Sequence, residues 1–71
     1  MEEFQARVVA EKEELDSKRD KLTAFIHGPI YAKLPEDERF RLMRQYCHMG
    51  DYSAVLGERI AAFNQPQTVG G

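Results

Sequence analysis

A stripe of side chains spaced alternately four and three residues apart runs along the first third of the sequence. Because this spacing places the side chains on one face of an α-helix, we expect that face to be buried. Two of its members, Glu11 and Lys18, are charged, and an unpaired buried charge costs several kcal/mol. We therefore expect the face to hold something besides a second apolar helix. The stripe consists of Phe4, Val8, Glu11, Leu15, Lys18, Leu22 and Phe25.

The length of the chain limits how it can be stabilised. Its 71 residues make at most one domain, and a domain of this size buries only about 60% of the surface that its unfolded chain exposes. Cys47 is the only cysteine, which excludes a disulfide within the chain, and with His27 and His48 it does not complete a tetrahedral zinc site. We therefore expect no metal and no cofactor, and stabilisation by self-association.

Composition and charge narrow the possible compartments and ligands. No run of residues approaches the roughly 20 apolar positions that span a membrane, and the acidic N-terminal stretch lacks the parts of a secretory signal. With a single free thiol, the chain is expected to be cytosolic. A net charge of −2 argues against duplex DNA or RNA as a ligand, because such binding needs a basic surface. A small phosphate ligand held by a few local cations is compatible with this charge.

Helix formers and turn residues predict an all-α fold, an antiparallel two-helix hairpin over residues 1–63. The first helix is expected over about 2–27, where Gly and Pro are absent. Gly28 is placed to take a left-handed conformation after it, and Pro29 cannot continue it. A loop over about 28–34 follows. Pro35 and the acidic residues after it predict the start of a second helix over about 35–63. The polar residues 64–71 are expected to form a disordered tail.

The second helix carries a similar stripe and also a face of small residues. Its stripe consists of Leu42, Gln45, Met49, Tyr52, Leu56, Arg59 and Phe63. Its small face consists of Met43, Cys47, Gly50, Ala54, Gly57 and Ala61. A glycine inside a helix costs about 1 kcal/mol relative to alanine, so Gly50 and Gly57 need a reason. One explanation is close packing against a neighbouring helix, and the other is a break at Met49–Asp51. Two helices cannot cover all these faces, which predicts a symmetric homo-oligomer.

Catalysis finds little support in the sequence. It has no independently supported Ser/His/Asp set, no glycine-rich phosphate loop and no metal cluster, so we expect no enzyme. Cys47 is expected to be a packed small hydrophobe. His27, at a helix end, is expected to contact exposed carbonyl groups.

The polar members of the two stripes allow alternative interpretations. Lys18 could form an ordinary salt bridge with Glu14, or it could form a cationic spot together with Arg19 and Lys21. Glu11 is expected to pair with Arg7.

At the far end of the second stripe, Arg59 could be a rim residue that reaches water. It could also grip a phosphate through two hydrogen bonds. Tyr52, two turns further in, would then supply a stacking surface for a base.

These residues resemble a small phage-encoded family of helical hairpins. The family includes the anti-CBASS cyclic-nucleotide sponges and is related to a Thoeris anti-defence hairpin domain. The resemblance covers roughly residues 4–63. It rests on Arg7, Val8, Glu11, Leu15, Lys18, Lys21, Leu22, Phe25, Ile26, Leu34, Gln45, Met49, Tyr52, Leu56, Arg59 and Ile60.

The resemblance implies binding without catalysis. Such sponges assemble as hexamers in the host cell cytoplasm and bind cyclic dinucleotides, and in separate pockets cyclic trinucleotides, between subunits. By binding these messengers tightly, the sponges lower the free concentration of messenger, so the host effector that the messenger would activate stays unoccupied. By this resemblance Phe4 would stack on a base, Lys18 would contact phosphate and Arg59 would serve the trinucleotide pocket. The family has Tyr where this chain has Phe4, which keeps the stacking surface but loses a hydroxyl hydrogen bond. The candidate ligand-binding residues are Phe4, Arg7, Lys18, Lys21, Tyr52 and Arg59.

Two other hypotheses belong to different classes of protein. In the first, the chain is a structural oligomerisation or protein-interaction module, and its polar stripe residues only specify register and partner. In the second, it is a small enzyme that degrades the messenger.

Overall fold

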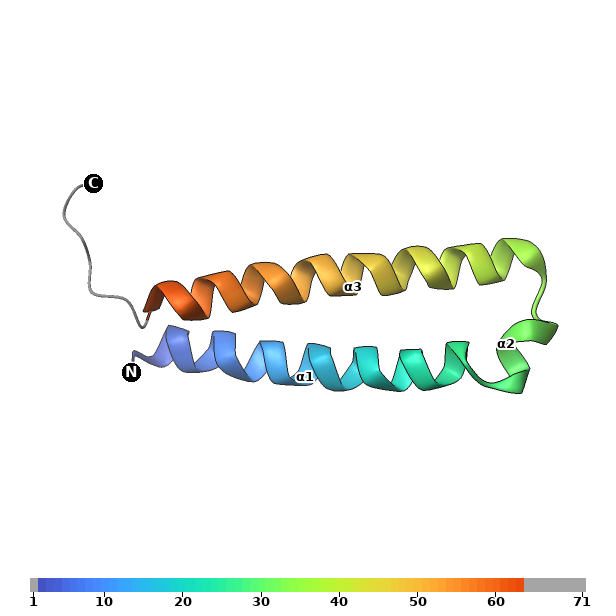
Figure 1. Ribbon diagram of the computed structural model, residues 1–71. Coiled ribbons are helices and arrows are strands. Elements are labelled where there is room, and N and C mark those ends of the chain that lie inside the picture. Colours follow the sequence, from blue (N-terminus) through green and yellow to red (C-terminus); the bar gives the residue numbers. More distant parts are fainter. Residues whose placement is uncertain (1, 64–71) are drawn as a thin grey trace.

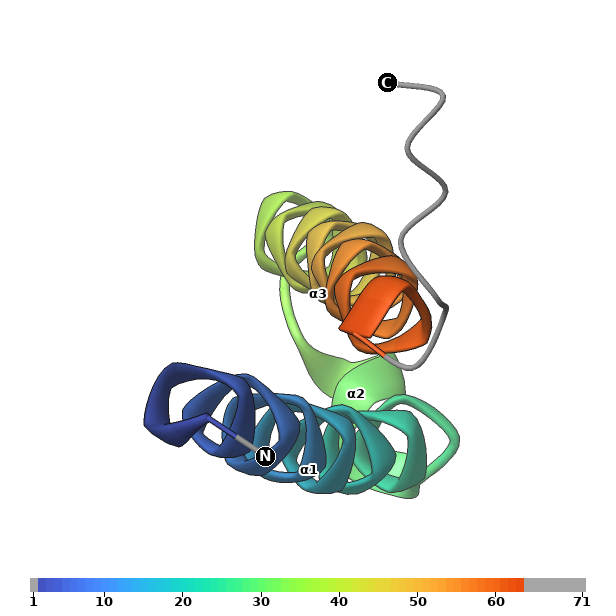
Figure 2. The same ribbon diagram turned by 90° about the vertical axis from the view of Figure 1, so that its left-hand side faces the viewer.

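The structure is a computed structural model that describes residues 2–63; the predicted tail, 64–71, lies outside the described residues. Two long helices, α1 (Glu3–Ile26) and α3 (Glu36–Phe63), are joined by the short helix α2 (Pro29–Lys33). Figure 1 shows α1 and α3 side by side and antiparallel, with α2 at the closed end of the hairpin. In the end view of Figure 2 the two long helices cross. The predicted all-α helical hairpin is confirmed.

Each end of α1 has an identifiable cap. At its start, the backbone N–H of Glu2 donates to the side-chain oxygen of Gln5 over 2.9 Å. At its end, the N–H of His27 donates to the carbonyl of Thr23 over 3.1 Å. The Nδ1 atom of the same histidine lies 2.8 Å from this carbonyl oxygen. His27 therefore contacts exposed carbonyl groups, as predicted.

The connection differs from the predicted loop. Gly28 is not left-handed, because its φ is −89° and its ψ is 173°. It acts as the N-cap of α2, and Pro29 occupies the first position of that helix, where its fixed φ is suitable and no N–H is needed. The loop expected over 28–34 therefore contains a helical turn. Tyr31 ties this turn to α3 by donating its hydroxyl to the carbonyl of Arg39 over 3.2 Å.

The second long helix begins one residue later than predicted and does not break. Pro35 precedes α3, and its carbonyl accepts hydrogen bonds from the N–H groups of Glu38 and Arg39 at 3.1 and 3.0 Å. The helix runs unbroken through Gly50 to Phe63, so the proposed break at Met49–Asp51 is wrong.

The packing face of the hairpin is rotated from both predicted stripes. Each stripe contains one series of residues, seven positions apart, that does face the partner helix; Leu15 belongs to the series of α1 and Leu56 to that of α3. Among the described residues, Val8 and Leu56 form the buried core and are 5% and 1% exposed. The stripe positions between the members of these two series were wrongly predicted to be buried. Glu11, Lys18, Phe25, Gln45, Tyr52 and Arg59 are exposed, whereas their neighbours Lys12, Arg19, Ile26, Tyr46, Ser53 and Ile60 are half-buried.

A first polar layer between the helices accounts for part of this rotation. The ammonium group of Lys12 lies 2.7 Å from Asp16 and donates to the hydroxyl of Ser53 over 3.0 Å. Ser53 donates in turn to Asp16 over 2.5 Å. A Cβ atom at Gly57 would lie 3.3 Å from the Cε of Lys12. We call these four residues the lysine layer.

A second polar layer lies nearer the closed end of the hairpin, seven residues after the lysine layer in α1 and seven residues before it in α3. The guanidinium carbon of Arg19 sits 4.2 Å from the centre of the Tyr46 ring, a cation–π contact. The hydroxyl of Thr23 donates to the carbonyl of Arg19 over 2.9 Å and lies 3.2 Å from the hydroxyl of Tyr46. A Cβ atom at Gly50 would come within 2.8 Å of Arg19. We call Arg19, Thr23, Tyr46 and Gly50 the arginine layer.

The two layers explain the helix glycines. Both Gly50 and Gly57 face cationic side chains of α1, so close packing against a neighbouring helix, the first of the two explanations, is confirmed. The rest of the predicted small face is exposed, and this includes Cys47, which was predicted to be packed.

Candidate ligand-binding face

The rotation of the packing face places the predicted stripe residues together on one side of the hairpin. Lys12 and Arg19 meet Gly57 and Gly50 on one side. Because each residue turns the helix by about 100°, positions just before the packing residues turn to the opposite side. We call these residues the ligand face. It consists of Phe4, Glu11, Lys18 and Phe25 of α1 with Gln45, Tyr52 and Arg59 of α3.

Contacts across the hairpin set the order of side chains along this face. The rings of Phe4 and Phe63 meet edge to face with centroids 5.7 Å apart. Arg59 lies one turn before Phe63 and therefore near the level of Phe4. Tyr52 lies between Gly50, which meets Arg19, and Ser53, which meets Asp16, and so shares the level of Lys18. This register places Arg59 within about one helical turn of the level of Phe4, and Tyr52 close to the level of Lys18.

These groups are accessible. Phe4 is 54% exposed and Tyr52 is 45% exposed, which leaves ring area for another planar group. Lys18 and Arg59 are exposed, and within residues 2–63 neither lies within ion-pair distance of a carboxylate. The predicted salt bridge between Glu14 and Lys18 is therefore not formed. The arrangement can offer stacking and positive charge to a ligand that carries planar bases and phosphates.

Lys18 also borders a shallow depression on the outer side of α1. This depression is lined by Glu13, Glu14, Ser17, Lys18 and Lys21. Its two lysines lie one turn apart and favour an anion, while the two glutamates beside them oppose one. Among the other candidate ligand-binding residues, Lys21 is the one that lines this depression together with Lys18.

The predicted pairing of Arg7 with Glu11 is not formed. The guanidinium of Arg7 lies 2.7 Å from the carboxylate of Glu3, one turn earlier, and both side chains are highly exposed, 76% and 80%. An exposed pair of this kind contributes less than about 1 kcal/mol. Arg7 can therefore leave Glu3 at small cost.

Some candidate residues are far apart within one chain. Phe4 and Lys18 are fourteen residues apart on α1, which corresponds to about 21 Å. Tyr52 and Arg59 are seven residues apart on α3, about 10 Å. A single hairpin therefore cannot place Phe4 and Lys18 on the same base and phosphate.

The two polar layers were missed by the sequence reasoning. Their signal is a shared seven-residue interval, which separates Lys12 from Arg19, Tyr46 from Ser53 and Gly50 from Gly57.

The lysine layer also affects the protonation of Asp16. Hydrogen bonds from Lys12, and next from Ser53, hold the pKa of Asp16 below its usual value.

Within residues 2–63, no three His, Cys, Asp or Glu side chains gather as metal ligands would. In the same part of the chain, no helix has the length and apolar character required to cross a membrane.

Comparison with known proteins gave one finding. The family model described as Sequestin matches residues 2–62, which include all three helices except the final residue of α3. No curated protein and no solved structure showed significant similarity to the chain.

Proposed function

The chain belongs to the Sequestin family, and we propose that it binds and sequesters cyclic di- and trinucleotide messengers without degrading them. In this proposal it is a phage anti-defence protein of the host cell cytoplasm that keeps CBASS effectors unoccupied. The family name supports sequestration of a ligand. The observation that carries the choice of ligand is the alternation along the ligand face of exposed rings with cations that have no ion-pair partner in residues 2–63.

The chemistry of that face fits a cyclic oligonucleotide better than a simple anion. Tyr52 and Phe4 supply planar surfaces for bases, and base stacking on an aromatic ring contributes about 1–3 kcal/mol. Lys18 and Arg59 supply the charge for the phosphates of the same ligand. An inorganic anion would use the cations but leave the rings without a partner.

The distances on one hairpin favour pockets formed between copies of the chain. Phe4 and Lys18 lie about 21 Å apart on one helix, so both can contact one compact ligand only if they come from different copies. The exposed aromatic and aliphatic side chains of the hairpin also favour assembly, and so does a core that, within residues 2–63, has two buried residues. We therefore propose a homo-oligomer, a hexamer by the resemblance to the sponges, with Arg7 and Lys21 at the margins of its pockets.

Sequestration acts by mass action. A protein that is abundant and binds the messenger more tightly than the effector does lowers the free concentration of the messenger. Sequestration requires no bond of the ligand to break. The ligand face is consistent with this, because it consists of rings, cations, one amide and the carboxylate of Glu11 and contains no nucleophile paired with a base.

Calorimetric titration with a panel of cyclic di- and trinucleotides tests this proposal. Lys18→Ala and Arg59→Ala should each lower the affinity for at least one ligand by about 10- to 100-fold, because each removes a charge-assisted hydrogen bond. Lys33→Ala, an exposed lysine at the closed end, is the matched control and should bind as the unmodified protein does. Absence of binding to every member of the panel would refute the proposal. Chromatography of the ligand released by heating should recover it intact; a cleaved ligand would indicate an enzyme.

A further inference from the structure

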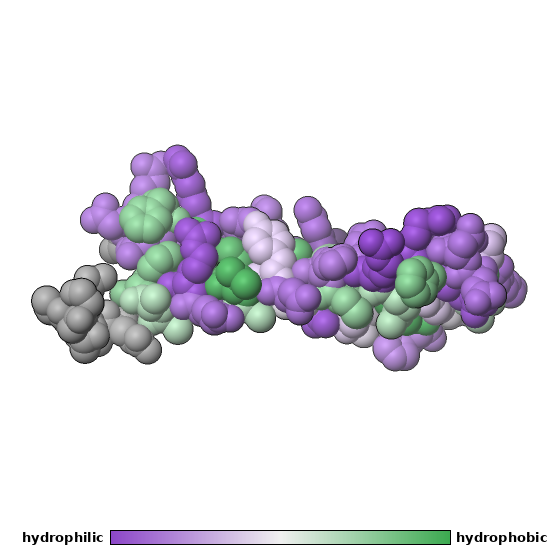
Figure 3. Space-filling view, turned by 90° about the horizontal axis from the view of Figure 1, so that it is seen from above, coloured by the Kyte–Doolittle hydropathy of each residue, from purple (hydrophilic) through white to green (hydrophobic). Residues whose placement is uncertain are grey.

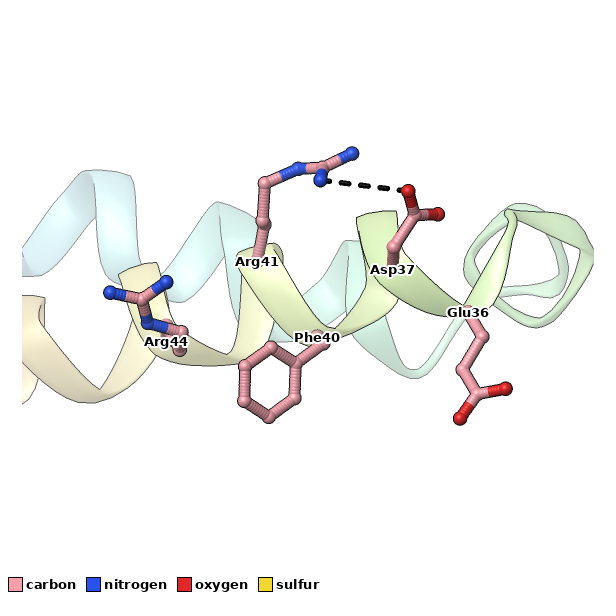
Figure 4. A pocket seen from close by; sticks show the side chains of 5 residues that line it. All are labelled: Glu36, Asp37, Phe40, Arg41 and Arg44. Carbon is pink, nitrogen blue, oxygen red and sulfur yellow. Dashed lines mark ion pairs between the residues drawn. The ribbon is translucent and has the colours of Figure 1, made fainter.

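The most exposed of the large apolar side chains in residues 2–63 lies on the outer side of α3. Phe40 is 65% exposed and borders a shallow depression lined by Glu36, Asp37, Phe40, Arg41 and Arg44. Figure 4 shows Phe40 between Glu36 and Arg44 along the helix, with Asp37 and Arg41 directed to another side. Covering a ring of this size is favourable, because its contact with water costs free energy.

The charges around Phe40 follow a definite order. Glu36 lies one turn before it and Arg44 one turn after it, and the spacing of four residues places all three on one ridge of the helix. Arg41 is already held by Asp37 at 3.6 Å and by Glu38 at 2.8 Å. Within the described residues, by contrast, Glu36 and Arg44 have no ion-pair partner.

This order is complementary to itself in the antiparallel direction. We propose that the surface formed by Glu36, Phe40 and Arg44 binds the same surface of a second copy of this chain about a two-fold axis at Phe40. Glu36 and Arg44 each lie four residues, about 6 Å, from Phe40 along the axis. A two-fold rotation therefore brings Glu36 of each copy level with Arg44 of the other, and it places the two phenyl rings against each other.

The surface has the composition of a contact between proteins. Aromatic and arginine side chains are enriched at interface centres, and complementary charges around them set the register. Met43, 40% exposed, adds apolar area beside Phe40. The space-filling view onto α3 in Figure 3 shows separate apolar patches among polar side chains. An apolar patch bounded by both signs of charge fits a second copy that carries the same charges in reverse order.

The contact lies apart from Lys18, Tyr52 and Arg59, the candidate ligand-binding residues in the middle and at the open end of the ligand face. Phe40 lies on the outer side of α3 and twelve residues from Tyr52, about 18 Å along the helix. This inference rests on the self-association that the proposed function includes, and it identifies one surface through which that association occurs. It does not depend on the identity of the ligand.

Charge reversal provides the test, with the dissociation constant of the assembly measured by sedimentation equilibrium. Glu36→Arg and Arg44→Glu each place like charges together at two symmetric positions, so each should weaken the association by about tenfold or more. The double variant restores opposite charges at both positions and should associate within about threefold of the unmodified protein. Phe40→Ala should weaken the association by at least about tenfold, because it removes the central ring.

Glu58→Arg is the matched control, an exposed acidic residue on the same helix but far from Phe40. It should leave the association unchanged, and circular dichroism should show that every variant keeps its helices. A double variant that associates no better than the single reversals would overturn the inference, and so would a monomeric unmodified protein. Strong association through this surface without binding of any cyclic nucleotide would support the inference and refute the proposed ligand.

Discussion

Gly50→Ala tests whether the arginine layer fixes the packing of the two long helices. A Cβ atom at this position would lie 2.8 Å from the Nη2 atom of Arg19 and 3.2 Å from its Cζ. The guanidinium would have to move away from the ring of Tyr46, which it now contacts at 4.2 Å. Replacing a helix glycine by alanine gains about 1 kcal/mol, while losing a partly buried cation–π contact costs about 1 kcal/mol. The single substitution should therefore change the free energy of unfolding little.

The outcome should differ once Arg19 is removed. In an Arg19→Ala background the new methyl group meets no guanidinium, so Gly50→Ala should stabilise the protein by about 1 kcal/mol. The double-mutant cycle should then give a coupling energy of about 1 kcal/mol. Urea unfolding followed by circular dichroism, at a fixed protein concentration, measures the four free energies. Equal effects of Gly50→Ala in both backgrounds would refute the role assigned to the arginine layer.

Three further predictions concern the core, pH and the ligand face. Leu56→Ala should lower the free energy of unfolding by about 2–5 kcal/mol, as measured by urea unfolding, whereas Val55→Ala, at a half-exposed neighbour, should cost much less; similar losses would contradict the assigned core. Hydrogen bonds hold the pKa of Asp16 below its usual value, so the stability that this group contributes is present above the usual carboxyl range and is lost as the pH falls through its lowered pKa. Acid titration should show a weaker pH dependence of stability in Asp16→Asn, and an unchanged dependence would contradict the lysine layer. Glu11→Gln removes a negative charge from the ligand face and should raise the affinity for cyclic nucleotides about twofold by calorimetry; lower affinity would mean that Glu11 contacts the ligand.

The sequence was sufficient to predict the hairpin because its signals are local. Helix formers, Pro29, Pro35 and the acidic residues after Pro35 lie next to the boundaries that they determine, and α1 and α3 end within a residue or two of the predicted positions. The conformation of Gly28 was predicted wrongly because glycine can also serve as an N-cap, and α2 begins directly after it.

The rotation of the packing face could not be predicted from periodicity alone. Apolar residues such as Leu15 and Leu22 recur every seven positions, and two polar candidates lie between them, Lys18 and Arg19. Which of the two faces α3 depends on contacts across the hairpin, here the ring of Tyr46 and the space beside Gly50. These partners lie about thirty residues away in sequence, beyond the reach of a local pattern.

The candidate site was predicted in composition but not in arrangement. The periodicity predicts that Lys18, Tyr52 and Arg59 belong to buried stripes, whereas all three are exposed in the structure. The similar levels of Tyr52 and Lys18, and of Phe4 and Arg59, follow from the register of the two helices, which a local pattern does not specify. The proposed pockets between copies of the chain would combine residues of different chains, whose relative placement no periodic pattern within one chain specifies.

Native mass spectrometry with and without a cyclic trinucleotide tests sequestration by an assembled protein most directly, because one spectrum reports both the number of subunits and the number of ligands. The account predicts a homo-oligomer that retains intact ligand at a fixed ratio and loses it in Arg59→Ala. A monomer, or an oligomer that retains no cyclic nucleotide of either ring size, would contradict it.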